Sequence, residues 1–183
     1  MSVLHRTSAD LELRSDGDGR TVYGIAVPFG QVAEVPDDYG SSYRETFVRG
    51  SFARTIVERG SRVKLLANHD RRRFPIGRPT VLREDAAGLY MEARISKTRD
   101  GDEALELIRD GALDRFSIGF RPIRHRVTPE RVVERTEVAL SEVSLVAFPA
   151  YDGAVLAGVR SGPFLTLEAA RKRLALIDKD FLL

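Results

Sequence analysis

The run 138–148 constrains the fold of this chain more than any other segment. Its eleven residues contain a single ionisable side chain, that of Glu142, and the surrounding segment 135–150 has the longest strand-like composition in the sequence. A strand this apolar needs a packed surface on at least one of its faces. We therefore expect it to form part of a sheet in the protein core.

Glu142 has two interpretations within that strand. A carboxylate is costly to bury unless it is paired or hydrogen-bonded, so a buried Glu142 requires a partner. Alternatively, Glu142 faces outward from a strand with one solvated side. Alternation of side chains places four residues on one mixed face, which leaves both interpretations open: Leu140, Glu142, Ser144 and Val146.

Shorter strand patterns occur along the rest of the chain. Strands are expected in five segments: 11–14 and 21–27 around a turn at 16–19, 62–70, 80–95 as two strands joined at 85–88, and 115–127, interrupted by Pro122. Residues 33–46 are polar and turn-rich and are expected to form a loop, as is the basic, proline-broken segment 71–79. These patterns predict a mainly β or α+β domain with a closed or nearly closed sheet.

Three helices are expected. In the first, 50–60, Ser51 caps the start and the apolar stripe consists of Phe52, Ile56 and Val57. The second, 100–111, is capped by Asp100 or Asp102 and ends at Gly111. The third, 166–178, is an amphipathic helix that packs on the barrel or binds a partner.

Composition excludes several classes of function. The 183 residues include no cysteine, which rules out disulfides, thiolate nucleophiles and cysteine-ligated zinc. The net charge of +2 provides no strong field for a polyanion. The sequence contains no apolar run long enough for a membrane span and starts without a signal-peptide pattern. We therefore expect a soluble intracellular protein without a metal or cofactor.

His69 and Ser117 are the other candidates for chemistry. His69 follows an apolar strand and precedes an abrupt loop, a place where scaffolds present functional side chains. Ser117 lies in the apolar stretch DRFSIGF, where a serine is more often structural. His5 is set aside because its leader is expected to fray, and His125 is expected on the surface. Adjacent His69 and Asp70 do not suit a metal site.

Together, a serine, a histidine and a carboxylate form the set needed for acyl transfer. A serine hydroxyl is a poor nucleophile unless an imidazole takes its proton. A third group holds the imidazole in the correct tautomer, and Glu142 has the chemistry for this role. The residues alone leave this as one interpretation beside structural ones.

The chain resembles a known family over roughly residues 20–158. The ordered segments that carry the resemblance include YGIAVPFG, VKLLANHD, GDEALELIRDGALDRFSIGF and LSEVSLVAFPAYDGA. They resemble segments of the tailed-phage prohead maturation proteases, which are related to the herpesvirus assemblins. The resemblance implies an assemblin-like β-barrel of about seven strands surrounded by helices. It also implies that His69 is the general base, Ser117 the nucleophile and Glu142 the third member, with Gly119 leaving room for a substrate backbone.

The resemblance also implies a biological role. Such a protease cleaves scaffold protein, the major capsid protein or both inside the procapsid, in the bacterial cytoplasm, and then cleaves itself. The expected division is a leader with the first strand at 1–19, a protease domain at 20–160 and a tail at 161–183. No nucleic-acid or membrane partner is expected, and a homo-oligomer is left open. The alternatives are a non-catalytic capsid-assembly protein on the same fold and a host-domesticated relative with the same chemistry.

Overall fold

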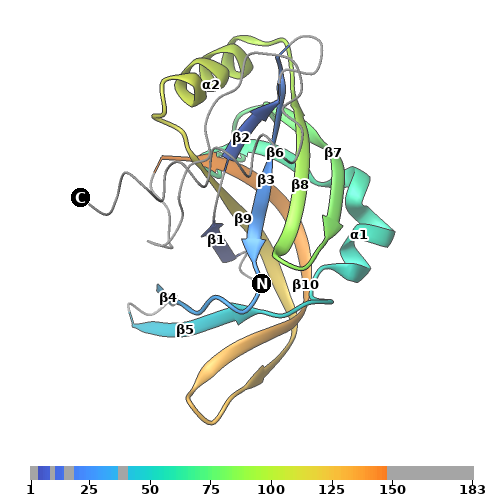
Figure 1. Cartoon of the computed structure of the whole chain (residues 1–183), viewed down its shortest axis with the longest axis vertical. Coiled ribbons are helices and arrows are strands. Elements are labelled where there is room, and N and C mark those ends of the chain that lie inside the picture. The colour runs from blue at the N-terminus through green and yellow to red at the C-terminus, as the bar shows by residue number, and fades with distance from the viewer. Residues whose placement is uncertain (1–3, 9–10, 15–18, 37–40, 148–183) are drawn as a thin grey trace, which may run out of the picture.

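The computed structural model describes residues 4–8, 11–14, 19–36 and 41–147, which form ten strands, two α-helices and one short 3-10 helix (Figure 1). The strands are β1 (Leu4–Ser8), β2 (Leu11–Arg14), β3 (Thr21–Pro28), β4 (Ala33–Pro36), β5 (Ser42–Phe47), β6 (Lys64–Ala67), β7 (Gly77–Glu84), β8 (Gly88–Ile95), β9 (Arg115–Val127) and β10 (Val132–Val146). The helices are α1 (Ala53–Arg59), η1 (Gly60–Arg62) and α2 (Arg99–Arg109).

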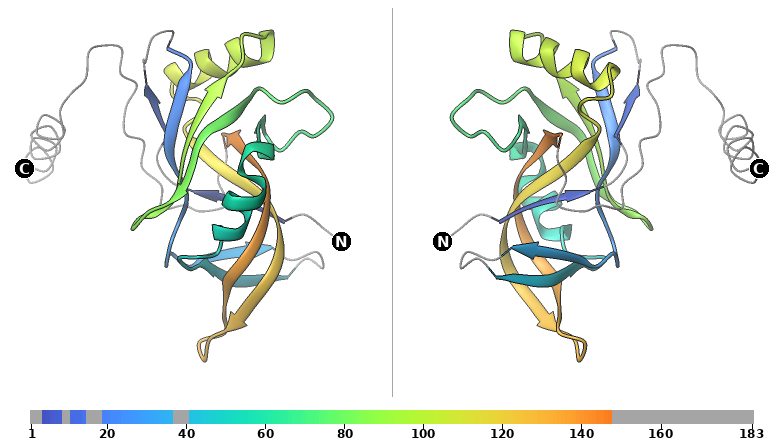
Figure 2. Two further views of the ribbon diagram at one scale, coloured as in Figure 1. Left: turned by 90° about the vertical axis from the view of Figure 1, so that its right-hand side faces the viewer. Right: turned by 90° about the vertical axis from the view of Figure 1, so that its left-hand side faces the viewer.

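All ten strands belong to one twisted sheet centred on β10. The hydrogen-bonded order is β1-β9-β10-β6-β7-β8-β3-β2, and β4 joins through β5, which also pairs with β10. β10 is antiparallel to β9, parallel to β5 near its start and parallel to β6 near its end. The far end of β9 and β10 protrudes from the body of the protein as a two-stranded hairpin (Figure 2). Residues 138–146 of the predicted apolar run thus belong to the central strand.

The mainly β class is confirmed, but closure of the sheet is not. In the described part of the chain, the hydrogen-bonded path runs from β1 to β2 without joining its two ends. The outer edge of β3 is occupied by β2, so β1 has no free edge there on which to pair. The leader was expected to fray, yet residues 4–8 form β1 and pair with β9.

The inner face of β9 and β10 carries the core. Its side chains are buried in one large apolar cluster: Phe116, Ile118, Phe120, Leu140, Val143 and Leu145. Phe47 meets Phe120 edge-on with ring centroids 5.2 Å apart and stacks on Phe52 at 5.5 Å. Burial of such large apolar side chains stabilises the fold by about 1.5–3 kcal/mol each, and it fixes β9 and β10 against the rest of the sheet.

A β-bulge at Ser141 sets which side chains of β10 leave the core. Leu140 pairs with Phe120, whereas Glu142 pairs with Gly119, so Ser141 is an extra residue in β10. Leu140 therefore faces the core and Glu142 faces the opposite side of the sheet, which we call the outer face. The expectation that Leu140 and Glu142 share a face is wrong, because simple alternation fails across a bulge.

The predicted loop 33–46 is also corrected, because it contains β4 and β5. β5 is held on β10 by a buried ion pair in which Arg135 Nε donates to Glu45 Oε2 at 2.7 Å. The guanidinium also donates to the Tyr43 hydroxyl at 2.8 Å. Within the segment, the Ser42 hydroxyl donates to Glu34 and the Tyr43 hydroxyl donates to Glu45 Oε2 at 3.2 Å.

Pro122 does not interrupt β9, which continues to Val127. The pairing with β10 is irregular here, since Pro122 pairs with Val138 while Arg124 pairs with Glu137, leaving Ile123 unmatched. Proline is tolerated in a strand where such an irregularity relieves it of a ladder hydrogen bond.

α1 lies beside β7 and β10, and its start is capped differently from expectation (Figure 1). Ser51 is buried and donates to the carbonyl of Arg135 at 2.6 Å. Glu84 of β7 instead accepts from the backbone N–H groups of Gly50 and Phe52, both at 2.7 Å. Val57, expected on the apolar stripe, is 86% exposed.

α2 is capped by Thr98, whose hydroxyl accepts from the N–H of Gly101 at 3.2 Å. Asp100 and Asp102 lie in the first turn rather than at the cap, where their charges still favour the helix dipole. Gly111 follows the helix with a φ of +81°, as expected for its end.

The loop after β6 is shorter than expected, because β7 begins at Gly77. The predicted helix 166–178 and the tail 161–183 lie outside the described residues. Within the described ranges, neither α-helix is long and apolar enough to cross a membrane.

The buried ion pair yields a stability prediction. Glu45→Ala should lower the free energy of unfolding by about 3–5 kcal/mol, because it leaves the Arg135 guanidinium buried without a counter-charge. The measurement is chemical denaturation. The double variant Glu45→Leu/Arg135→Met, which removes both charges, should recover most of the loss. A cost below about 1 kcal/mol for the single variant would show that the pair behaves like an exposed one.

Candidate active site

A tight turn at the end of β6 positions His69. The N–H of Asp70 donates to the carbonyl of Ala67 at 3.0 Å, and the two residues between them, Asn68 and His69, have φ values of +49° and +58°. The left-handed region is unfavourable for histidine, and such strain persists where the surrounding structure enforces it. Here the N–H of Asn68 donates to the carbonyl of Leu145 at 2.9 Å, which ties the turn to β10.

The outer faces of β9 and β10 present the other two candidates. Ser144 of β10 pairs with Ser117 of β9, and Glu142 pairs with Gly119. Because paired residues point to the same side of a sheet, Ser117 and Glu142 lie on one face, two residues apart along the strands. The bulge at Ser141 is what brings Glu142 onto this face.

The three predicted residues form one hydrogen-bonded chain. His69 Nδ1 lies 2.7 Å from Glu142 Oε1, and His69 Nε2 lies 2.7 Å from Ser117 Oγ. An ionised carboxylate only accepts hydrogen bonds, so it favours the tautomer with the proton on Nδ1. In that tautomer Nε2 is a free lone pair directed at the hydroxyl proton of Ser117. This is the arrangement a general base requires.

The three groups differ in how deeply they are buried. Ser117 and Glu142 are 1% and 2% exposed, whereas the side chain of His69 is 20% exposed. Burial of the Glu142 carboxylate rules out the outward-facing, solvated interpretation. Its desolvation is offset by hydrogen bonds to both oxygens, since Ser144 Oγ donates to Oε2 at 2.8 Å. The histidine ring is the most accessible of the three groups.

Ser144 was not recognised as part of the site from the sequence. Besides donating to Glu142, its hydroxyl accepts the backbone N–H of His69 at 3.1 Å. One buried serine therefore links the carboxylate to the strained turn. The available signal was its position two residues after Glu142, which places it on the same face of an uninterrupted strand.

Gly119 has a different role from the one expected. A Cβ on this residue would lie 2.2 Å from Glu142 Oε1 and 2.9 Å from the carboxyl carbon. The space at Gly119 is therefore filled by the carboxylate of Glu142, not left open for a substrate backbone. Glycine here permits the carboxylate to cross over β9 and reach the imidazole.

A protein-family model described as caudovirus prohead serine protease matches residues 9–162. The chain belongs to this family. The family description specifies a serine protease, and among the serines that the structure describes, Ser117 is the one whose hydroxyl contacts a histidine ring.

One sequence relative agrees with this membership. The prohead protease of Enterobacteria phage HK97 is 25% identical over 155 residues, which cover 83% of this chain and 66% of that protein. The chain thus spans just under two thirds of the length of this relative. Among solved structures, the bacteriophage T4 capsid assembly protease matches with a TM-score of 0.45 and 14% identity, covering 71% of this chain and 98% of that chain.

His125 stays outside the candidate active site. His125 is exposed and pairs with Arg135, in the part of β9 and β10 near the protruding hairpin. His5 lies on β1, at the backbone position that pairs with Gly119. No cluster of three or more potential metal ligands occurs among the described residues.

The packing of Glu142 on Gly119 can be tested without a substrate. In Gly119→Ala the new methyl group should displace the carboxylate, the flexible end of the Glu142 side chain, and break its bond to His69 while the fold survives. A strong imidazole–carboxylate hydrogen bond gives a downfield Nδ1–H proton in NMR spectra, and this signal should disappear. Any hydrolysis dependent on Ser117 should fall by about 10²–10⁴-fold, as when a triad carboxylate is lost.

Gly60→Ala is the matched control, because a Cβ at Gly60 meets no atom within 4 Å and its backbone is helical. This variant should keep the NMR signal. Persistence of the signal in Gly119→Ala would contradict the packing described for Glu142.

Proposed function

We propose that this chain is a serine endopeptidase that cleaves scaffold protein, the major capsid protein or both during maturation of a phage head, and that it also cleaves itself. The observation that carries the proposal is the unbroken chain of contacts from Ser117 through His69 to Glu142, each 2.7 Å long. Membership of the prohead serine protease family supports it.

In the proposed acylation step, Ser117 Oγ attacks the carbonyl carbon of the scissile peptide bond. His69 Nε2 takes the hydroxyl proton as the new C–O bond forms. Glu142 holds the Nδ1–H of the ring and stabilises the imidazolium that results. His69 then returns the proton to the nitrogen of the breaking C–N bond, and the amine product leaves an acyl-enzyme on Ser117.

Deacylation repeats these roles with water. His69 removes a proton from a water molecule, which attacks the acyl carbon, and then returns the proton to Ser117 Oγ as the ester bond breaks. Because β9 and β10 are fixed by the core on their inner face, the nucleophile and the carboxylate are held rigidly. Holding reacting groups in the correct geometry can lower the activation free energy by up to about 7–11 kcal/mol.

Capsid and scaffold proteins are proposed as substrates because of the chain's relatives. The names of two of them describe a prohead protease and a capsid assembly protease. We place the activity inside the procapsid in the host cytoplasm. The same proposal divides the chain into a leader at 1–19, the protease domain at 20–160 and a tail at 161–183.

We further propose that the sheet is a variant of the assemblin barrel. β1, at one end of the hydrogen-bonded path, contacts β3, which lies next to the other end. A sheet that curls until β1 contacts β3, with its core inside and the candidate catalytic groups outside, supports this relation.

The test is coexpression of the chain with its cognate capsid and scaffold proteins. Ser117→Ala should reduce processing by about 10⁴–10⁶-fold, because the hydroxyl is the attacking group. Ser61→Ala, which alters an exposed serine of η1, is the matched control and should process normally. Equal processing by Ser117→Ala would refute the assignment of the nucleophile. Failure of the unaltered protein to cleave either substrate would favour the non-catalytic assembly role.

A further inference from the structure

A row of cations extends from beside the active site across the outer face of three strands. Lys64 of β6 pairs with Glu142 of β10 and therefore lies on the same face. Leu65 and Gly77 pair facing the core, so the next residue on β7, Arg78, returns to the outer face, where it pairs with Arg94 of β8. We call Lys64, Arg78 and Arg94, with Arg71 from the adjoining loop, the basic stripe.

Two cavities follow the basic stripe. The first, about 330 Å³, is lined by Glu142, Ser141, Leu66, Lys64, Arg71 and Arg73. The second, about 410 Å³, is lined by Lys64, Arg78 and Arg94. Lys64 and Pro75 line both, so the two cavities adjoin, and we call them together the trough; Glu142 lines its first cavity.

Folding alone does not account for these charges. Arg78 lies directly opposite another cation, Arg94, so this strand pairing gives Arg78 no counter-charge. Lys64, Arg71 and Arg78 make no side-chain hydrogen bond or ion pair within the described part of the chain. The acidic groups nearby are already engaged: Asp100 with Arg73 at 3.2 Å, and Glu142 with His69.

We propose that the trough is a substrate subsite that binds an acidic segment of the polypeptide to be cleaved. The inference rests on the proposed protease function and names the class of sequence that this site selects. Arg78 presents a planar guanidinium group suited to a carboxylate, and Lys64 adds a point charge nearer the scissile bond.

The distances suit a peptide in extended conformation. Ser117 and Lys64 are separated by two strand spacings of about 4.8 Å and by two residues of about 3.4 Å along the strands, roughly 12 Å in all. About four extended residues cover that span at about 3.3 Å each. Aspartate or glutamate is therefore selected about four to six residues from the cleaved bond, on the side of the substrate that crosses β10 toward β6.

A polypeptide fits the trough better than a nucleic acid. Single-stranded nucleic acids are bound through aromatic side chains on which the bases stack, and neither cavity is lined by an aromatic residue. Glu142, a member of the candidate active site, also lines the first cavity, so a peptide bound at Ser117 lies close to the trough.

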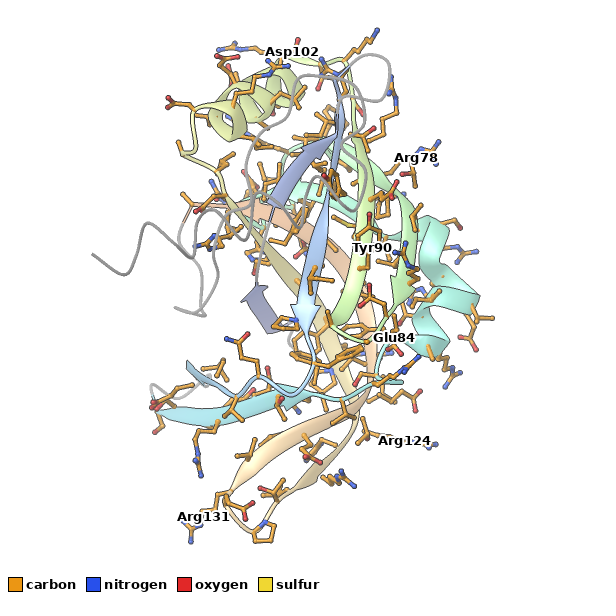
Figure 3. The ribbon with its side chains drawn as sticks, in the orientation of Figure 1. Arg78, Glu84, Tyr90, Asp102, Arg124 and Arg131 are labelled. Carbon is orange, nitrogen blue, oxygen red and sulfur yellow. The ribbon has the colours of Figure 1, made fainter. Side chains whose placement is uncertain are left out.

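The experiment measures binding separately from cleavage. A fluorescein-labelled twelve-residue peptide rich in glutamate is titrated with the Ser117→Ala protein, and fluorescence anisotropy gives the dissociation constant. In the Ser117→Ala background, Lys64→Gln/Arg78→Gln should weaken binding by about tenfold or more, and added salt should weaken it further. The matched control is Arg131→Gln, since Arg131 lies at the tip of the protruding hairpin, far from Arg78 (Figure 3). It should bind as tightly as Ser117→Ala alone.

Each outcome decides the proposal. Absence of binding to the Ser117→Ala protein, or an equal loss in the Arg131→Gln control, overturns it. Displacement of the peptide by a single-stranded DNA oligonucleotide at lower concentration than by unlabelled peptide overturns it in favour of a nucleic-acid site. Binding without Ser117-dependent cleavage by the unaltered protein refutes the proposed protease function and leaves the anion-binding trough. Cleavage with no binding or acidic preference refutes the trough alone.

Discussion

The contact between the buried carboxylate of Glu142 and the imidazole of His69 is the interaction on which the rest of the site depends. A carboxylate that is 2% exposed is tolerated because His69 and Ser144 satisfy its two oxygens. The same contact fixes the ring with its second nitrogen toward Ser117. One interaction therefore makes the burial of the charge acceptable and creates the conditions for a nucleophilic hydroxyl.

Three features of the backbone serve this interaction. The bulge at Ser141 turns Glu142 away from the core, and Gly119 leaves the space its carboxylate occupies. The left-handed turn at the end of β6 carries His69 across to meet it, at a cost in backbone strain that the hydrogen bond from Asn68 to β10 helps to offset. Each feature is unfavourable or unnecessary in a sheet built for stability alone, and all three converge on a few atoms.

Much of this was predictable from local sequence. The strand around Ser117, the central strand with Glu142 and the helix ending at Gly111 follow from periodicity and end signals, and the resemblance singled out the three residues that the structure brings together. The predictions that failed concern features that depend on contacts between residues distant in sequence. The bulge arises from pairing with β9, β5 depends on Arg135, and the cap of α1 comes from Glu84 on another strand. Closure of the sheet likewise depends on whether the strands at its two ends, β1 and β2, pair with each other, and local sequence does not determine this.

The central proposal is that His69 and Glu142 activate Ser117 as a nucleophile. The most direct measurement is the reaction of the purified protein with a fluorophosphonate, a probe that phosphonylates activated serines, with the adduct located by tandem mass spectrometry. The account predicts a single adduct on Ser117, with a labelling rate that falls steeply in His69→Ala. An adduct on another serine, or labelling of Ser117 that is unchanged without His69, would contradict it.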